Sequence, residues 1–246
     1  MNISILCPTR QRPIQFQMMM DSLFEHTINK QDIEIHVTID NDDNVAMEAF
    51  EKVQNKYPKE NIILHRRKRG NSLVSHYFNW MCQFAKGKYI LLINDDCLFR
   101  TYAWDFGVYN RLEEFLKDKP DGIVLGTIRD NLIYEENRQI EPYLIGIFPL
   151  LSKKAYEVMG YFLDPHYFSS TSDWDICRLY GSIGRQVDLR NICFIEHNPP
   201  EFYPYKNVNI WRDAIWEEIA EQIPCKIIDG IDSRKEILLN YINSFK

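Results

Sequence analysis

Residues 89–96 read Tyr-Ile-Leu-Leu-Ile-Asn-Asp-Asp, five apolar or aromatic residues followed at once by three polar ones. A short apolar run bounded by polar residues is typical of a strand that is buried on both faces. We therefore predict a strand at 89–93 that ends at Asn94, Asp95 and Asp96. Oxygen ligands at a strand end suit Mg²⁺ or Mn²⁺. The same three residues are also compatible with a solvated turn.

Three further strands are predicted upstream of this stretch, and each is followed by a helix. The strands are 3–7, 33–39 and 62–65, and the helices are 13–26, 45–56 and 72–84. Regular alternation of this kind predicts an α/β fold with a mostly parallel central sheet and helices on both faces. Ligands bind such sheets beyond the carboxyl ends of the strands. The predicted site therefore combines residues 8–10, 40–43 and 94–96.

The second half of the chain has a more mixed pattern. We predict helices at 104–116, 153–159, 172–180, 211–222 and 233–245, extended segments at 122–127, 143–151 and 193–195, and a Pro- and Tyr-rich loop at 199–205. This loop could act as a lid over a bound ligand. No internal repeat or low-complexity segment interrupts the pattern.

Composition excludes several classes of protein. The 246 residues include 29 basic and 35 acidic side chains, for a net charge of −6, which argues against binding to nucleic acid or anionic lipid through bulk charge. No apolar run reaches the ~18 residues of a membrane-spanning helix. The N-terminus has no basic leader, so we expect no secretory signal. Six dispersed cysteines without a Cys-x-x-Cys pair predict free thiols and a cytoplasmic protein.

Five motifs occur along the chain in a specific order. They are Cys7-Pro-Thr-Arg-Gln-Arg-Pro13, Ile39-Asp-Asn-Asp-Asp43, Asn79 with Ala85-Lys-Gly-Lys-Tyr-Ile90 and the acidic 94–96 stretch, Gly160-Tyr-Phe-Leu-Asp164, and Ser172-Asp-Trp-Asp175. In this order the chain resembles the family 2-type glycosyltransferases of the GT-A fold, within the nucleotide-diphospho-sugar transferase superfamily. The resemblance spans residues 1–198. Two positions depart from the family pattern, because Asn94 replaces the first Asp of the Asp-x-Asp motif and Ser172 replaces a Glu.

The resemblance implies a GT-A domain at 1–198, with a nucleotide-binding half at about 1–100 and an acceptor half at about 101–198. Residues 199–246 would form a C-terminal loop and helical extension packed on the same domain. The implied activity is metal-dependent transfer of a sugar, a hexosyl or pentosyl group, from a nucleotide-diphosphate sugar such as a UDP-sugar to an acceptor hydroxyl.

The resemblance also assigns roles to the residues of the motifs. Asp96 would bind Mn²⁺ or Mg²⁺, and His197 would be a further metal ligand or a diphosphate contact. A histidine at a strand end can equally be a hydrogen-bonded surface residue. The expected donor-binding residues are Pro8, Thr9, Arg10, Arg12, Asp40, Asp42, Asn79, Asn94 and Asp95. Among these, Asp40 and Asp42 could accept the imide N–H of a base or cap a turn, and Arg12 could contact phosphate or be a solvated charge.

Asp173 is the candidate catalytic base. Sugar transfer needs a group that takes the proton of the attacking hydroxyl, and a carboxylate can do so. One base and direct displacement predict inversion at the anomeric carbon. The alternative is that Asp173 and Asp175 stabilise the start of a helix through its dipole. We interpret Asp175 as structural.

The acceptor is the least determined partner. A glycan is the commonest family acceptor, and a hydroxyl on a modified DNA base is a minor option suggested by the basic run Arg66-Arg-Lys-Arg69. That run could also contact a diphosphate, or be a solvated loop. Trp174, Trp211, Tyr203 and Tyr205 could stack on sugars or belong to the core.

Two other functions fit the same sheet. A nucleotidyltransferase is disfavoured because the loop after the first strand contains no glycine. A non-catalytic module that binds nucleotide or glycan is favoured only by Asn94.

Overall fold

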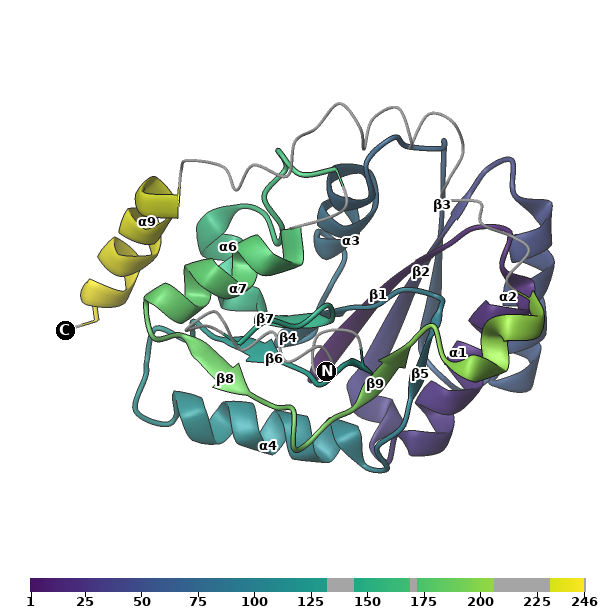
Figure 1. Cartoon of the computed structure of the whole chain (residues 1–246), viewed down its shortest axis with the longest axis horizontal. Coiled ribbons are helices and arrows are strands. Elements are labelled where there is room, and N and C mark those ends of the chain that lie inside the picture. Colours follow the sequence, from purple (N-terminus) through teal and green to yellow (C-terminus); the bar gives the residue numbers. More distant parts are fainter. Residues whose placement is uncertain (132–143, 169–171, 206–230, 246) are drawn as a thin grey trace.

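The computed structural model describes residues 1–131, 144–168, 172–205 and 231–245. Its centre is a seven-stranded sheet in the order β3-β2-β1-β4-β7-β6-β8 (Figure 1). The strands of this sheet are β1 Ile3–Thr9, β2 Ile33–Asp40, β3 Ile62–Arg67, β4 Tyr89–Leu92, β6 Leu125–Thr127, β7 Pro149–Ser152 and β8 Gln186–Asp188. The predicted α/β class, with a mostly parallel sheet and helices around it, is confirmed.

The first half alternates strand and helix as predicted. β1 pairs in parallel with β2 on one side and with β4 on the other, while β3 lies outside β2. The intervening helices are α1 Pro13–His26, α2 Asn44–Lys56 and a segment that begins as a π-helix at Val74–Phe78 and continues as α3 Asn79–Cys82. Pro8 lacks an N–H donor, and it lies beyond Leu6, the last β1 residue in the register with β4. Beyond Leu6, contacts between the two strand ends are made by side chains, as in the hydrogen bond from Thr9 Oγ1 to Asp95 Oδ2.

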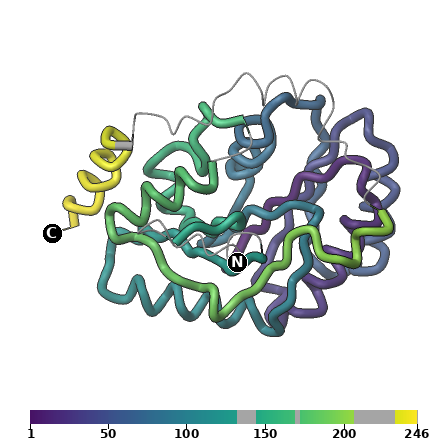
Figure 2. Tube along the Cα trace, viewed as in Figure 1, coloured from purple at the N-terminus to yellow at the C-terminus, as the bar shows by residue number. Residues whose placement is uncertain are grey.

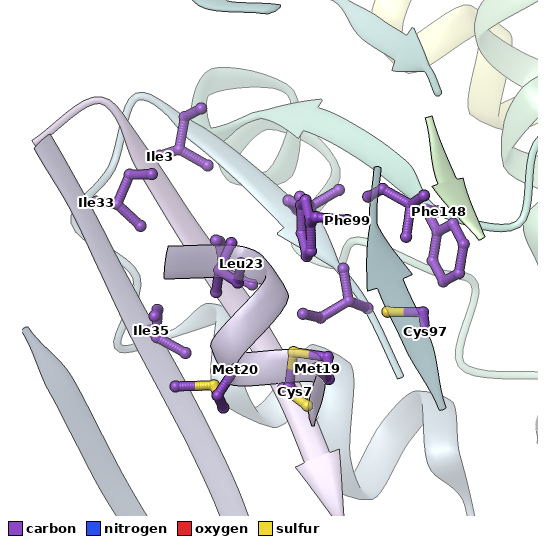
Figure 3. Close-up of a cluster of buried hydrophobic side chains, with 14 of the residues drawn as sticks. Ile3, Cys7, Met19, Met20, Leu23, Ile33, Ile35, Cys97, Phe99 and Phe148 are labelled. Atoms are coloured by element: carbon purple, nitrogen blue, oxygen red, sulfur yellow. The ribbon is translucent and has the colours of Figure 1, made fainter. Parts of the chain in front are cut away.

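Alternating side chains of each strand fill two separate cores. Ile3, Ile5 and Cys7 point to the face covered by α1, α2 and α4 (Trp104–Leu116), as Figure 3 shows for Ile3 and Cys7 beside Met19, Met20 and Leu23. Leu6, and Ile90 and Leu92 of β4, point to the opposite face, where α3, α6 (Lys153–Met159) and α7 (Ser172–Ser182) pack. Successive side chains of a strand point to opposite faces of the sheet, so each strand contributes apolar side chains to both buried faces.

The second half adds antiparallel pairings. β7 runs antiparallel to both β4 and β6, and β8 is parallel to β6. A second, two-stranded sheet pairs β5 Cys97–Phe99 with β9 Ile195–His197 in antiparallel fashion. In that register Cys97 lies opposite His197. Two segments almost one hundred residues apart in sequence are thereby brought together next to the acidic strand end.

Several predicted boundaries change in the structure. The predicted strand 193–195 is found at Ile195–His197, and the strand Cys97–Phe99 was missed. The predicted loop 199–205 is wrong, because Pro200–Tyr205 forms a 3₁₀ helix, η3. Its Phe202 is buried, and Gln15 Nε2 of α1 donates to Tyr205 O at 3.3 Å, so η3 packs on α1. The predicted helix 211–222 lies outside the described residues.

The last helix, α9 (Ile231–Asn243), packs at the end of the molecule that α6 and α7 occupy (Figures 1 and 2). Leu238 is fully buried and Ile242 nearly so, both in the core that α7 also covers. Within the described residues, no helix combines the length and apolar character needed to cross a lipid bilayer.

Candidate active site

The loop after β1 places Arg10 and Arg12 at the carboxyl edge of the sheet. Gln11 has a positive φ of 52°, and its backbone N–H donates to Asp43 Oδ2 at 2.6 Å. Asp43 also caps α2, because its Oδ1 accepts the Ala46 N–H at 3.0 Å. One carboxylate therefore fixes both the start of α2 and the turn that presents the two arginines. α1 follows directly, with Pro13 in its first turn.

Arg10 is held by the acidic turn after β2. Its Nη1 lies 3.0 Å from Asp40 Oδ2 and 2.8 Å from Asp42 Oδ1, while its Nη2 donates to Asp42 Oδ2 at 3.1 Å. Tyr77 Oη donates to Asp40 Oδ1 at 2.7 Å. Both oxygens of the buried Asp40 are thus occupied, whereas the Asp42 side chain is 61% exposed. Hydrogen bonding to Arg10 lowers the pKa of Asp42.

Arg12 joins the two aspartates that follow β4. Its Nη1 lies 2.6 Å from Asp96 Oδ2 and 3.1 Å from Asp95 Oδ1. Thr9 Oγ1, at the end of β1, donates to the second oxygen of Asp95 at 2.8 Å. Burial raises the pKa of Asp95, and the attraction of Arg12 only partly offsets this effect. Asp95 is almost inaccessible, and its two oxygens are engaged by Arg12 and Thr9.

Asp96 faces His197 across the β5–β9 pairing. The distance from Asp96 Oδ1 to His197 Nε2 is 3.3 Å, and that oxygen is buried without a hydrogen-bond donor. Burial raises the pKa of Asp96, but contacts with His197 and Arg12 outweigh it and lower the pKa overall. Asn131 fixes the histidine backbone through bonds of 2.8 and 3.0 Å. The result is an anionic oxygen and an imidazole nitrogen held side by side.

This pair fits a divalent cation. Mn²⁺ binds carboxylate oxygen and imidazole nitrogen, and Asp96 Oδ1, which is buried and makes no hydrogen bond to the described residues, would gain a bond to the cation. Within the described residues, no group of three His, Cys, Asp or Glu side chains converges on one point. Among the described residues, Asp96 and His197 would hold the cation, and oxygens of a bound donor and water would fill further coordination positions.

A cavity of about 370 Å³ opens beside this pair. Four of the residues that line it are polar: Asn94, Ser172, Asp173 and His197. The other lining residues are apolar or aromatic: Leu73, Phe78, Leu92, Ile93, Ile147, Pro149, Leu163 and Trp174. An apolar cavity with a few convergent polar groups is the usual form of a small-molecule site.

Asp173 is the titratable acid in this cavity. It lies in the first turn of α7, and its Oδ1 accepts the Trp174 N–H at 3.0 Å. Burial raises its pKa to about 6. A carboxylate with a pKa near neutrality can both hold and release a proton at physiological pH, as a general base must.

Comparison with known families identifies the chain. The model of Glycosyl transferase family 2 matches residues 4–171. The chain belongs to this family. It is therefore a glycosyltransferase, and the resemblance seen in the sequence is confirmed. The matched region ends just before Ser172 and Asp173, so the candidate base lies immediately beyond it.

Solved structures with the same fold are also glycosyltransferases. A mannosyltransferase from Pyrobaculum calidifontis in complex with GDP-Man and Mn²⁺ has a TM-score of 0.61 and 14% identity, covering 98% of this chain and 69% of its own. TarS 1–349 of S. aureus in complex with UDP has a TM-score of 0.60 and 15% identity, with coverages of 99% and 71%. GalNAc-T7 with UDP, GalNAc and Mn²⁺ has a TM-score of 0.60 and 12% identity, with coverages of 98% and 55%. A sequence comparison with curated proteins gave no match.

Several predicted donor-binding residues of this glycosyltransferase are engaged by the protein itself, Asp40 and Asp95 through the contacts above and Asn79 through backbone groups. Asn79 Oδ1 accepts the N–H groups of Phe162 and Leu163, both at 3.0 Å, and its Nδ2 donates to Leu163 O at 2.6 Å. Pro8 is buried within β1. The other predicted site residues lie at or just beyond the carboxyl ends of β1, β2 and β4, in α7 and in β9. They are Thr9, Arg10, Arg12, Asp40, Asp42, Asn94, Asp95, Asp96, Asp173 and His197.

Part of the basic run at residues 66–69 contacts other parts of the protein. Arg66 Nη2 donates to Asn41 O at 2.7 Å, and the Arg67 guanidinium lies about 5 Å from the rings of Tyr77 and Trp80. Lys68 and Arg69 are exposed. Of the four aromatic candidates, Trp174 lines the cavity, Tyr203 and Tyr205 are exposed on η3, and Trp211 lies outside the described residues.

Sequence reasoning included Asp43 in the predicted 40–43 part of the site but gave it no role, and it missed Tyr77 and the apolar lining of the cavity. The capping role of Asp43 could have been found, because an Asp directly before a helical pattern is a helix-start signal. Tyr77 gave no such signal, since its contact with Asp40 joins residues 37 positions apart.

Proposed function

We propose that this glycosyltransferase transfers a sugar from a nucleotide-diphosphate sugar to an acceptor hydroxyl with inversion. The observation that carries the proposal is one cavity lined by Asn94, Asp173 and His197, with Asp96 touching the histidine at 3.3 Å. A candidate base and a candidate cation site share that space. The ligands bound in the structural neighbours, GDP-Man, UDP and Mn²⁺, support the same donor class.

Asp96 and His197 are the residues that would hold Mn²⁺ or Mg²⁺. The cation would compensate the negative charge that develops on the departing diphosphate. Arg12 adds a guanidinium that already spans both aspartates, next to where that diphosphate would lie. We propose that the Asp42 and Arg10 pair and Thr9 line the nucleoside end of the donor.

Asp173 would act as the general base. Its carboxylate takes the proton of the acceptor hydroxyl as the hydroxyl oxygen attacks the anomeric carbon, and the bond from that carbon to the diphosphate oxygen breaks. The apolar cavity wall limits access of water, which would otherwise compete as an acceptor. A single displacement of this kind inverts the anomeric configuration.

We favour a glycan as the acceptor. The DNA alternative depends on the basic run, and two of its four members, Arg66 and Arg67, contact the protein's own backbone and rings. We favour catalysis over a non-catalytic binding role because binding alone does not require a carboxylate with the raised pKa of Asp173. The five cysteines of the described part are buried free thiols, which supports a reducing compartment such as the cytoplasm.

The proposal is tested in two steps. A thermal-shift screen of UDP-, GDP-, CMP- and dTDP-sugars, with and without Mn²⁺, identifies a donor by the rise in melting temperature. Release of the nucleoside diphosphate and transfer to a glycan panel are then measured for the wild type, Asp96→Ala and Asp173→Asn. The matched control is Asp118→Asn, on an exposed position. We expect both site variants to lose transfer and the control to keep it. Unchanged transfer in Asp173→Asn would exclude Asp173 as the base.

A further inference from the structure

Arg234, on α9, lies buried between two aspartates from different segments. Its Nη1 lies 2.5 Å from Asp175 Oδ2 and 3.1 Å from Asp164 Oδ2, and its Nη2 donates to Asp175 Oδ1 at 2.8 Å. The side chains of Arg234, Asp175 and Asp164 are 8%, 2% and 6% exposed. A bidentate guanidinium–carboxylate pair fixes both distance and orientation, more so than a single ion pair.

Both aspartates directly follow residues that line the candidate cavity, although neither lines it. Asp175 is in the first turn of α7, directly after the two cavity residues Asp173 and Trp174. Asp164 follows Leu163, which also lines this cavity. Arg234 itself is not among the lining residues. It therefore reaches the cavity only through the two segments that it connects.

Asn79 fixes the Leu163 segment from the other side. Its amide makes three bonds to the backbone of residues 162 and 163. In the first turn of α7, Asp173 Oδ1 accepts the N–H of its neighbour Trp174, a bond within the turn itself. The bidentate pair of Arg234 with Asp175 is a polar contact that connects this turn to a helix about 60 positions away in sequence, and so it can orient the turn.

We propose that Arg234 is a positioning residue for the base Asp173. By holding Asp175 against Asp164, it sets the angle of the α7 turn and so the distance from the Asp173 carboxylate to the acceptor hydroxyl. The inference rests on the proposed function of Asp173. A displacement of about 1 Å at a reacting group can cost on the order of 100-fold in rate. The C-terminal helix is then part of the catalytic architecture, although none of its residues lines the cavity.

The test compares kcat, donor KM and melting temperature across a set of variants. The set is Arg234→Met, Arg234→Lys, Asp175→Asn and the double variant Arg234→Met with Asp175→Asn. The control is Lys235→Met, the adjacent α9 residue, whose contact with Asp232 at 3.8 Å is on the surface. The measured reaction is release of the nucleoside diphosphate from the sugar nucleotide that the wild type turns over.

We expect Arg234→Met to lower kcat about 10- to 100-fold with donor KM within about twofold of the wild type. Arg234→Lys keeps the positive charge but loses the bidentate contact of the guanidinium, so its kcat should lie between those of the wild type and Arg234→Met. The control should match the wild type. Arg234→Met leaves the carboxylate of Asp175 buried without its counterion, and the double variant replaces that carboxylate by an amide. We therefore expect the double variant to regain melting temperature relative to Arg234→Met, while its kcat stays low.

Three results would overturn the inference: wild-type kcat in the folded double variant, wild-type kcat in Arg234→Met, or an equal loss of donor binding and kcat. The first would show that Arg234 serves stability alone. These outcomes are distinct from failure of the proposed function, which would appear as no turnover in the wild type or full turnover in Asp173→Asn.

Discussion

The guanidinium of Arg12 lies 2.6 Å from one oxygen of Asp96, and the other oxygen of that carboxylate faces His197 at 3.3 Å. The same aspartate is therefore shared between a fixed cation of the protein and the position proposed for a metal ion. Arg12 and a bound Mn²⁺ would repel one another across a few ångströms, so their charges are not independent.

Removing the charge of Arg12 should strengthen metal binding. In Arg12→Met, Asp95 and Asp96 lose their counterion, and we expect Mn²⁺ affinity to rise about tenfold or more. Titration of free Mn²⁺ by electron paramagnetic resonance measures this without turnover. The control is Arg111→Met, which removes an exposed arginine paired with Glu114. Equal or weaker Mn²⁺ binding in Arg12→Met would contradict the assignment of Asp96 as a ligand.

Transfer should depend on pH through Asp173. Burial raises its pKa to about 6, and a base acts only when it is deprotonated. Activity at saturating donor and acceptor should therefore be low at pH 5, rise with an apparent pKa of about 6, and level off above pH 7. The pH profile of kcat checks this. A profile that is flat from pH 5 to 8 would mean that no such base is needed.

Asp173→Asn should stabilise the fold at neutral pH. The folded pKa of Asp173 is raised above its unfolded value, so ionisation costs stability as pH rises from about 4 through about 6. Replacing the carboxylate removes that cost, and we expect a gain of about 1–3 kcal/mol at pH 7. Urea unfolding at pH 7 and at pH 4.5 measures it. The gain should shrink at the lower pH, where the wild-type side chain is already mostly protonated, and a gain that did not shrink would have another cause.

Asn79→Ala should destabilise the cavity wall. The change leaves two N–H groups and one carbonyl of residues 162–163 without their partner, and we expect a loss of about 1–3 kcal/mol. Thermal unfolding measures the loss, and Asn55→Ala, at an exposed α2 position, is the control. If Asn79 bound the donor directly, the dominant effect would instead be weaker nucleotide binding at unchanged stability.

The exposed half of the basic run distinguishes the two acceptor classes. The double variant Lys68→Glu with Arg69→Glu reverses two charges at the end of β3. With a neutral glycan acceptor we expect transfer to change less than about twofold, because few of its contacts are ionic. With DNA, affinity should fall and its dependence on salt concentration should become shallower. Transfer assays at 50 and 200 mM salt separate these results.

The first ninety residues were largely predictable because their structure depends on local patterns. The β-strand runs at Ile3, Ile33, Ile62 and Tyr89 are short, apolar and separated by amphipathic helices, so their type and order follow from periodicity alone. Asp43 and Pro13 mark helix starts by local chemistry. The short strand Cys97–Phe99 gave no comparable signal, because three residues carry no periodicity and its partner lies far away in sequence.

The sequence by itself determined the strand ends that carry Thr9, Asp40 and Asp96, and with them the edge of the sheet where the site forms. Only the tertiary structure decided which of these side chains are free to act. Asp40 and Asn79 hydrogen-bond to residues 37 and more than 80 positions away in the sequence. The β5–β9 pairing brings His197 to Asp96, and α9 brings Arg234 to Asp175. Periodicity encodes where a chain turns, but contacts across such separations depend on the packing of the whole domain, which no local pattern records.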